Sequence, residues 1–263
     1  MTKTSLVKYF SLSLSLLFSN LCFAQHNLQL QNKDSLQLKA QNCKKITVVG
    51  AIAIPTFFIG YGIIAQGNNG LRKLDKSTHN SIITNHPGYK TKVDNYIQFT
   101  PAVAVYGLNA LGIKGKNNFV DRTMIYALSN IVSTVFSYTL KHTTKVTRPD
   151  GSANNSFPSG HTTTAFAAAA FLHHEYKKVS PWIAVAGYAA ATTTSILRVY
   201  NNKHWVSDVV AGAGFGILST KLAYLVYPAI KRNLFKKKTM NAMIIPYYKN
   251  GGGGFALVYS FKK

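Results

Sequence analysis

The chain has 263 residues and a formal net charge of +23, because 30 Lys and Arg residues outnumber 7 Asp and Glu residues. This length is enough for one sizeable hydrophobic core, and no internal repeat divides it. Seven scattered carboxylates argue against a carboxylate-built metal site and against two-metal phosphatase chemistry, while the basic surface indicates polyanionic partners such as lipid phosphates.

Residues 1–24 have the pattern of a secretory signal peptide. Lys3 and Lys8 form a basic region, and an apolar stretch and a small-residue cleavage pattern follow. Export predicts a location in the bacterial cell envelope, and it favours lipid over nucleic acid as the anionic partner. Removal of this segment takes away Cys22, so the mature chain keeps only Cys43 and forms no internal disulfide.

Residues 25–45 are rich in Gln, Lys, Asn and Leu, without a sustained period, and we interpret them as a polar leader. Residues 46–65 are apolar apart from an interruption at Pro55, and they are long enough to cross a bilayer or to form a buried helix. Residues 66–94 contain several Gly and Asn residues and five basic residues, which predicts a polar loop. Loops of this length are often lids or binding surfaces.

The remaining apolar stretches predict an all-α, six-helix bundle. With residues 46–65 as the first helix, the other five are 96–113, 122–140, 160–175, 181–197 and 206–227. We expect Asp121 to cap the third helix and Pro228 to end the sixth. Many Ala and Gly residues in the last two helices allow close helix packing, as in membrane bundles.

The C-terminal part, residues 231–263, is predicted to lie outside the helical domain of residues 46–230. It begins with a basic segment at 231–238, which suits either an anionic membrane surface or simple solvation. Alternating apolar residues at 243–248 and 255–261 then flank four glycines, which predicts a small β-hairpin. An isolated hairpin is marginally stable, so we expect it to pack on another element.

Three short motifs between residues 141 and 208 carry the reactive side chains. In chain order they are Lys141-x6-Arg148-Pro149, Pro158-Ser159-Gly160-His161 and Arg198-x5-His204-x3-Asp208. The second motif lies at the predicted start of a helix, where free N–H groups and partial positive charge favour a phosphate-like anion. Three cations, two histidines and a carboxylate in one stretch suit phosphoryl transfer.

These motifs, in this order, resemble the signature of the type 2 phosphatidic acid phosphatase (PAP2) superfamily, which also holds bacterial class A acid phosphatases and vanadium haloperoxidases. The resemblance covers residues 141–208 by motif and extends by helix order to residues 46–227. It implies a helical bundle with the site at one end, and it implies neither a cofactor nor a metal. The chain departs from the family at Leu197, where a serine is common, so one phosphate hydrogen bond is missing.

The resemblance also implies a role for each motif residue. His204 would attack phosphorus to form a phosphohistidine, Asp208 would hold its other ring nitrogen, and His161 would protonate the leaving alkoxide. The phosphate oxygens would be bound by the remaining motif residues, Lys141, Arg148, Ser159, Gly160 and Arg198. A single histidine is more often structural, but the joint spacing favours catalysis for these two. We interpret the other histidines in the mature chain as structural or surface residues, among them His79, His86, His142, His173 and His174.

We therefore expect a metal-independent phosphatase of an envelope lipid, such as phosphatidic acid, phosphatidylglycerol phosphate, an isoprenyl pyrophosphate or a lipid A-like glycolipid. A periplasmic acid phosphatase for soluble phosphate esters is the first alternative. A vanadium haloperoxidase and a non-enzymatic envelope-binding protein are less favoured, because the former are usually much larger and because the intact motifs argue against a degenerate site.

Lys and Arg residues are unevenly distributed between the two ends of the predicted bundle. If six helices span a membrane, the end opposite the motifs carries 17 of them and the motif end carries 10, which agrees with motifs facing the periplasm. A cleaved signal would invert this orientation. Either the first segment is retained, or some helices do not span and the bundle lies in or on the membrane from the periplasmic side. A mean hydropathy of only +0.03 favours the second arrangement.

Overall fold

The computed structural model of the protein describes residues 52–234, 242–249 and 252–259. The predicted signal peptide at 1–24 and the polar leader at 25–45 lie outside these residues, as does the beginning of the apolar stretch at 46–65. The rest of that stretch forms the helix Ile52–Ile64.

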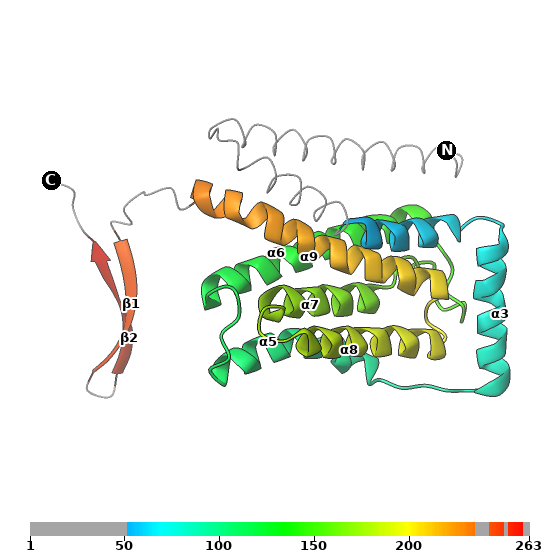
Figure 1. Ribbon diagram of the computed structural model, residues 1–263, viewed down its shortest axis with the longest axis horizontal. Coiled ribbons are helices and arrows are strands. Elements are labelled where there is room, and N and C mark those ends of the chain that lie inside the picture. The colour runs from blue at the N-terminus through cyan, green and yellow to red at the C-terminus, as the bar shows by residue number, and fades with distance from the viewer. Residues whose placement is uncertain (1–51, 235–241, 250–251, 260–263) are drawn as a thin grey trace. The chain divides into compact units, whose positions relative to one another are not determined.

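The described residues before the hairpin fold into a helical bundle, which confirms the predicted all-helical class (Figure 1). After the helix Ile52–Ile64 come three shorter helices, α3 (Gly70–Asn85), α4 (Asp94–Ile97) and α5 (Thr100–Ala110). Four longer helices follow, α6 (Phe119–Thr144), α7 (Gly160–Tyr176), α8 (Pro181–Tyr200) and α9 (Val206–Leu234).

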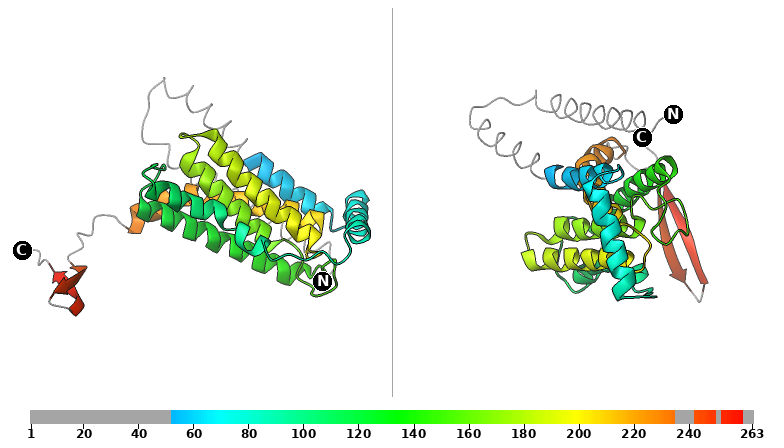
Figure 2. Two further views of the ribbon diagram at one scale, coloured as in Figure 1. Left: turned by 90° about the horizontal axis from the view of Figure 1, so that it is seen from below. Right: turned by 90° about the vertical axis from the view of Figure 1, so that its right-hand side faces the viewer.

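Helices α6 to α9 run alternately in opposite directions (Figures 1 and 2). The connections between α7 and α8 and between α8 and α9 are short, and short connections favour antiparallel neighbours. The ends of α6 and α8 therefore meet the starts of α7 and α9 at the same end of the bundle. All three sequence motifs lie at this end.

Helix α7 forms the centre of the bundle, with α8 and α9 packed against it. Its alanines are almost fully buried, and glycines of α9 allow the two backbones to approach closely. A Cβ atom at Gly212 would lie 2.8 Å from the Ser159 carbonyl oxygen, and one at Gly216 would overlap the Thr163 carbonyl oxygen. The contact between α7 and α9 therefore has no room for a larger residue at either position.

Helix α3 stands across the motif end of the bundle (Figures 1 and 2), so the prediction of a continuous loop over residues 66–94 was wrong. The Asn69 side chain caps this helix, accepting hydrogen bonds from Leu71 N at 3.0 Å and Arg72 N at 3.1 Å. Within α3 only Asp75 is fully buried. The helix therefore lacks the buried apolar stripe on which recognition of a helix from sequence depends.

Three other predicted boundaries are corrected by the structure. Predicted helix 96–113 is divided between α4 and α5, with a break at residues 98–99. Helix α6 is capped by Asn118 rather than by Asp121, and the Asn118 Oδ1 atom accepts from Asp121 N at 2.8 Å. Helix α9 continues through Pro228, and Lys231 in its last turns pairs with Asp121 of α6 at 2.6 Å. This ion pair ties the segment beyond the proline to the bundle.

At the C-terminus, strands β1 (Ala242–Lys249) and β2 (Gly252–Tyr259) pair in antiparallel register, with Ile244 opposite Leu257. That the hairpin packs on another element stays a prediction. Among the described helices, the segment Val206–Asn233 alone is long and apolar enough to cross a membrane, with a mean hydropathy of 1.6. About two thirds of it is buried inside the bundle, as in the core helix of a soluble protein.

Candidate active site

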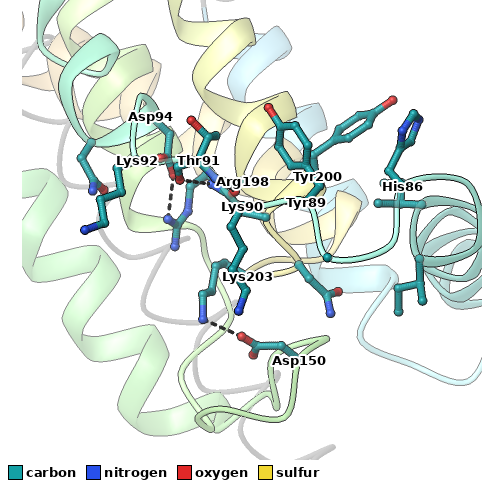
Figure 3. A pocket seen from close by; sticks show the side chains of 16 residues that line it. His86, Tyr89, Lys90, Thr91, Lys92, Asp94, Asp150, Arg198, Tyr200 and Lys203 are labelled. Atoms are coloured by element: carbon teal, nitrogen blue, oxygen red, sulfur yellow. Dashed lines mark hydrogen bonds and ion pairs between the residues drawn. The ribbon is translucent and has the colours of Figure 1, made fainter.

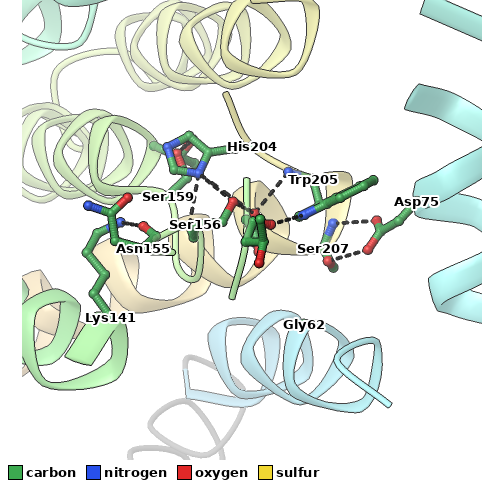
Figure 4. A network of polar contacts seen from close by, with 12 residues as sticks. Gly62, Asp75, Lys141, Asn155, Ser156, Ser159, His204, Trp205 and Ser207 are labelled. Atoms are coloured by element: carbon green, nitrogen blue, oxygen red, sulfur yellow. Dashed lines mark hydrogen bonds and ion pairs between the residues drawn. The ribbon is translucent and has the colours of Figure 1, made fainter. Parts of the chain in front are cut away.

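His204 lies in the turn before α9, where it is 2% exposed and held in one tautomer (Figure 4). Its Nδ1 atom lies 2.9 Å from the Ser156 carbonyl oxygen. A carbonyl can only accept, so the ring proton is on Nδ1 and the lone pair is on Nε2. The unprotonated nitrogen of His204 is therefore the one available for attack on an electrophile.

The Asp208 carboxylate lies one helical turn further on and supports the same ring. Its Oδ2 atom is 3.7 Å from His204 Nδ1, which is beyond hydrogen-bond distance. The direct hydrogen bonds to Oδ2 come from the Ser156 hydroxyl and from the Trp205 N–H, the latter at 2.9 Å. Asp208 thus acts on His204 through its field and through Ser156, a less direct contact than the one predicted.

Burial lowers the pKa of His204 to about 4, although the nearby Asp208 carboxylate raises it. Lys141 and Arg198 also lower this pKa through their positive charge. The imidazole is therefore neutral at physiological pH, which a nucleophile requires.

The start of α7 lies beside this histidine and is arranged for an anion. Ser159 is fully buried, and its backbone N–H donates to the Asp208 carbonyl at 3.0 Å, which ties the starts of α7 and α9 together. Its hydroxyl makes no capping bond to the helix and instead accepts from Thr162 at 3.0 Å. The Ser159 hydroxyl can therefore still donate its proton, and the first-turn N–H groups, beginning at Gly160, are not capped by it and suit an anion.

His161, the predicted acid, follows directly on α7. Its Nε2 atom lies 2.8 Å from the Asn95 Oδ1 atom in α4. Burial, together with the positive charge of Arg198, lowers the pKa of His161 to about 4. A dianionic phosphate bound between these groups would offset that charge and raise the pKa, so substrate binding favours the protonated form.

Three cations surround the two histidines. Arg198 donates from Nη1 to Asp94 Oδ2 at 2.8 Å, while its Nε atom and the other Asp94 oxygen have no hydrogen-bond partner among the described residues. Lys141 donates to the Asn155 carbonyl at 2.5 Å, and burial, together with nearby Arg148, lowers its pKa to about 8. The buried Nε atom of Arg148 likewise has no partner in the described part of the chain. These free donors match the needs of phosphate oxygens.

A pocket of about 610 Å³ opens beside Arg198 (Figure 3). One wall is the segment from His86 to Asn95, and the other is the end of α8 with the following turn. Lys203 of that turn pairs with Asp150 at 2.6 Å. Burial raises the pKa of Asp150, but hydrogen bonds from Lys203 and Ser152 outweigh this effect and lower it to about 2.

Helix α3 fixes the turn between His204 and Asp208 from outside (Figure 4). Asp75 is 1% exposed and accepts from Ser207 N at 2.9 Å and from Ser207 Oγ at 2.5 Å. Arg72 pairs with the same carboxylate at 3.3 Å and lies over the Trp205 ring at 4.4 Å. Burial raises the pKa of Asp75, while the hydrogen bonds from Ser207 lower it.

All eight predicted site residues thus lie at one end of the bundle. Four further residues of this site were not predicted from the sequence, namely Ser156, Asp94, Asn95 and Asp75. Asp75 and Asp94 lie in the stretch predicted as a loop, and Asn95 directly follows it. The only sequence signal of these three was a carboxylate or amide in or beside a polar segment. Among the described residues, no three His, Cys, Asp or Glu side chains form a group that could hold a metal ion.

The protein is thus a helical bundle in which two histidines and three cations surround the start of a buried helix, an arrangement that suits a phosphate-like anion. Residues 122–232 match the model of the PAP2 superfamily, which confirms the predicted resemblance.

The chain is 40% identical over 167 residues to a lipid A 1-phosphatase of Porphyromonas gingivalis, a match that covers 60% of this chain and 38% of that protein. A lipid A 1-phosphatase of Rhizobium johnstonii is 40% identical over 79 residues, which are 29% of this chain and 30% of that one. The chain therefore spans less than half the length of these relatives.

Among solved structures, the bundle is similar to a transmembrane PAP2-type phosphatidylglycerolphosphate phosphatase from Bacillus subtilis. The TM-score is 0.51 and the sequence identity is 23%, over 70% of this chain and 98% of that chain. This likeness shows the fold.

Proposed function

We propose that the protein is a metal-independent phosphatase that removes a phosphate group from an envelope glycolipid of the lipid A type. The observation that carries this proposal is the unprotonated Nε2 atom of buried His204, which lies among three cations at the start of α7. The lipid A 1-phosphatase relative at 40% identity supports the choice of a phosphorylated glycolipid among the lipid substrates.

The geometry supports a two-step reaction. In the first step the Nε2 atom of His204 attacks phosphorus, the bond between phosphorus and the sugar oxygen breaks, and His161 gives its proton to the departing oxygen. Arg198, Arg148 and Lys141 stabilise the charge on the remaining phosphate oxygens. In the second step a water molecule, losing its proton to His161, attacks the phosphohistidine, which releases inorganic phosphate and restores both histidines.

We also propose that the bundle is embedded in the membrane and exported, with its motif end toward the periplasm. Large apolar side chains remain exposed along the outer helices, among them Ile131, Val135 and Tyr138 of α6 and Trp182, Val185 and Ile196 of α8. Exposed apolar surface on this scale is costly in water and favourable against acyl chains.

The test is metal-free phosphate release by the purified protein with EDTA present. Bisphosphorylated lipid A in detergent, long-chain phosphatidic acid and a soluble aryl phosphate would each be supplied to the wild type and to His204→Ala. We expect the fastest release from the glycolipid and a trapped phosphoenzyme that the substitution abolishes. Faster turnover of the aryl phosphate would instead support a periplasmic acid phosphatase, and release that survives the substitution would contradict the phosphohistidine mechanism.

A further inference from the structure

We infer that the pocket beside Arg198 is a second binding site for the substrate, which takes the sugar and a second anionic group of a bisphosphorylated glycolipid headgroup. This inference rests on the proposed function and adds to it the feature of the substrate that the enzyme selects. The reacting phosphate would lie at His204, and the second anionic group would lie on two lysines of the segment before α4.

The wall of the pocket is a built structure rather than a loose loop. Asn201, just after α8, is 9% exposed, and its amide makes two hydrogen bonds to the backbone of Thr91. Its Oδ1 atom accepts from Thr91 N at 2.8 Å, and its Nδ2 atom donates to the Thr91 carbonyl at 3.0 Å. Because Thr91 is fixed from both sides, its neighbours Lys90 and Lys92 are held at the rim of the pocket (Figure 3).

The pocket has an excess of positive charge, which favours an anionic ligand. Both carboxylates that line it are already paired, Asp94 with Arg198 at 2.8 Å and Asp150 with Lys203 at 2.6 Å. Lys90 and Lys92 have no ion-pair partner within the described residues. Two lysines without an ion-pair partner in the described part of the pocket wall suit a ligand group that carries negative charge, such as a phosphate monoester.

The opposite part of the pocket is aromatic. The Tyr89 and Tyr200 rings meet edge to face at 5.7 Å, and His86 lies 5.4 Å from Tyr200. Tyrosine offers a flat apolar face together with a polar hydroxyl, which suits the ring and hydroxyl groups of a sugar. A volume of about 610 Å³ lies within the usual range for small-molecule sites, so the pocket has room for a sugar headgroup.

The pocket is continuous with the catalytic groups. Arg198 and Asn95 both line it, and the same two residues contact the catalytic centre, Arg198 through its charge on His204 and Asn95 through its hydrogen bond to His161. A headgroup that fills the pocket would therefore place its other end at the two histidines.

The experiment compares two glycolipids that share the reacting phosphate and differ only in the second phosphate, which are bisphosphorylated lipid A and its monophosphorylated form. The measured quantity is the ratio of kcat/KM for the two. We expect the wild type to prefer the bisphosphorylated lipid by about tenfold, and Lys90→Ala/Lys92→Ala to reduce this ratio to about 1, since the charge-assisted contacts to the second phosphate are then lost.

The matched control is Lys177→Ala/Lys178→Ala, which removes the same charge from exposed lysines at the end of α7 away from the motifs. We expect this variant to keep the wild-type ratio. An equal fall in both variants would indicate general attraction by the basic surface, and a wild type without preference would also overturn the inference. If neither glycolipid reacts while phosphatidic acid does, the glycolipid substrate of the proposed function fails instead.

Discussion

Both ends of the bundle bury an arginine against a carboxylate, but only one of these pairs faces a pocket. Away from the motifs, Arg122 and Glu175 lie 3.7 Å apart with their side chains 1% and 0% exposed. Glu175 also accepts hydrogen bonds from Asn117 N at 2.9 Å, from the Asn117 amide at 2.6 Å and from the Tyr224 hydroxyl at 2.5 Å. At the motif end, Arg198 pairs with Asp94 at 2.8 Å and lines the pocket.

The difference shows that burial of an ion pair does not by itself mark a functional site. The Glu175 carboxylate has donors on both oxygens, and they fasten the segment before α6 to the end of α7. The Asp94 carboxylate keeps one oxygen without a partner within the described residues, and both arginines keep unpaired nitrogens, Nε in Arg198 and Nε and Nη1 in Arg122. The difference is that Arg198 lines a pocket, where an unpaired donor can meet a ligand, whereas the Arg122 pair is enclosed and fastens the fold.

The largest expected effect compares one histidine at each end of the bundle, buried His204 and half-buried His174. His204→Ala should lower kcat by roughly 10⁴-fold or more, because the proposed reaction passes through a phosphoenzyme on His204. The matched variant is His174→Gln at the other end, where His174 stacks on Tyr224 at 4.4 Å. It should keep activity per folded molecule within about threefold, as expected for a site outside the reaction. Steady-state kinetics would check both variants, with the folded fraction of each measured by thermal unfolding. An equal loss of kcat in the two variants would contradict the division between the two ends.

The same substitution should affect different properties at the two arginines, which are catalysis at Arg198 and stability at Arg122. Arg198→Lys should lower kcat/KM by roughly 10²–10³-fold, since the planar fork of donors is lost while the charge beside Asp94 remains. Arg122→Lys should instead lower the free energy of unfolding by about 3 kcal/mol, because it disturbs an enclosed ion pair. Kinetics and denaturant titration of both variants would measure this. Loss of activity without loss of stability in Arg122→Lys would contradict the division.

A smaller effect is expected at Asp75, which holds the turn that carries His204, the proposed nucleophile. Asp75→Asn should lower kcat roughly 10-fold with little change in KM, because an amide cannot accept both hydrogen bonds from Ser207 and the turn shifts. Asp75→Glu should restore part of the rate. Reduced stability with an unchanged kcat per folded molecule would show that Asp75 has only a structural role.

The smallest expected effect is on pH dependence. The folded-state pKa of His204 is about 4, below the unfolded value of about 6.5. The unfolded chain therefore binds protons first as the pH falls from about 6.5 to 4, so the free energy of unfolding should decrease over this window. The imidazole carbon signals of wild type and His204→Ala, compared by NMR, would identify a residue that stays neutral down to about pH 4. A midpoint near 6.5 for that residue would contradict the prediction.

The sequence was most informative where a chemical requirement and a helix boundary coincide. Gly160 and His161 were predicted at a helix start, and α7 begins at Gly160. Arg198, His204 and Asp208 could be grouped because their spacing resembles the third motif of the PAP2 signature. The contacts of Asp94 and Asp75 could not be predicted, since both depend on α3 and α4 lying across the end of the bundle. Those helices are placed by buried polar contacts, which leave no periodic apolar pattern in the sequence.

The helix ends show the same limit on a smaller scale. Asp121 and Asn118 are both good capping residues, and the local sequence does not decide between them. Asn118 is the cap because the Asp121 carboxylate is already bound by Tyr227 and Lys231, which lie more than 100 positions away in the sequence. Lys231, which makes one of these contacts, lies in the part of α9 that continues past Pro228.

The close contact of α7 with α9 at Gly212 and Gly216 has a consequence for how this enzyme could change its substrate. Two helices that touch through their backbones cannot rotate or slide without collision, so His161 and His204 keep a constant separation. The distance between the two proposed catalytic histidines is then fixed, so a substrate of different shape has to be accommodated by other parts of the site. Directed evolution toward a new headgroup should therefore accumulate changes in residues 86–95 and leave the two glycines untouched.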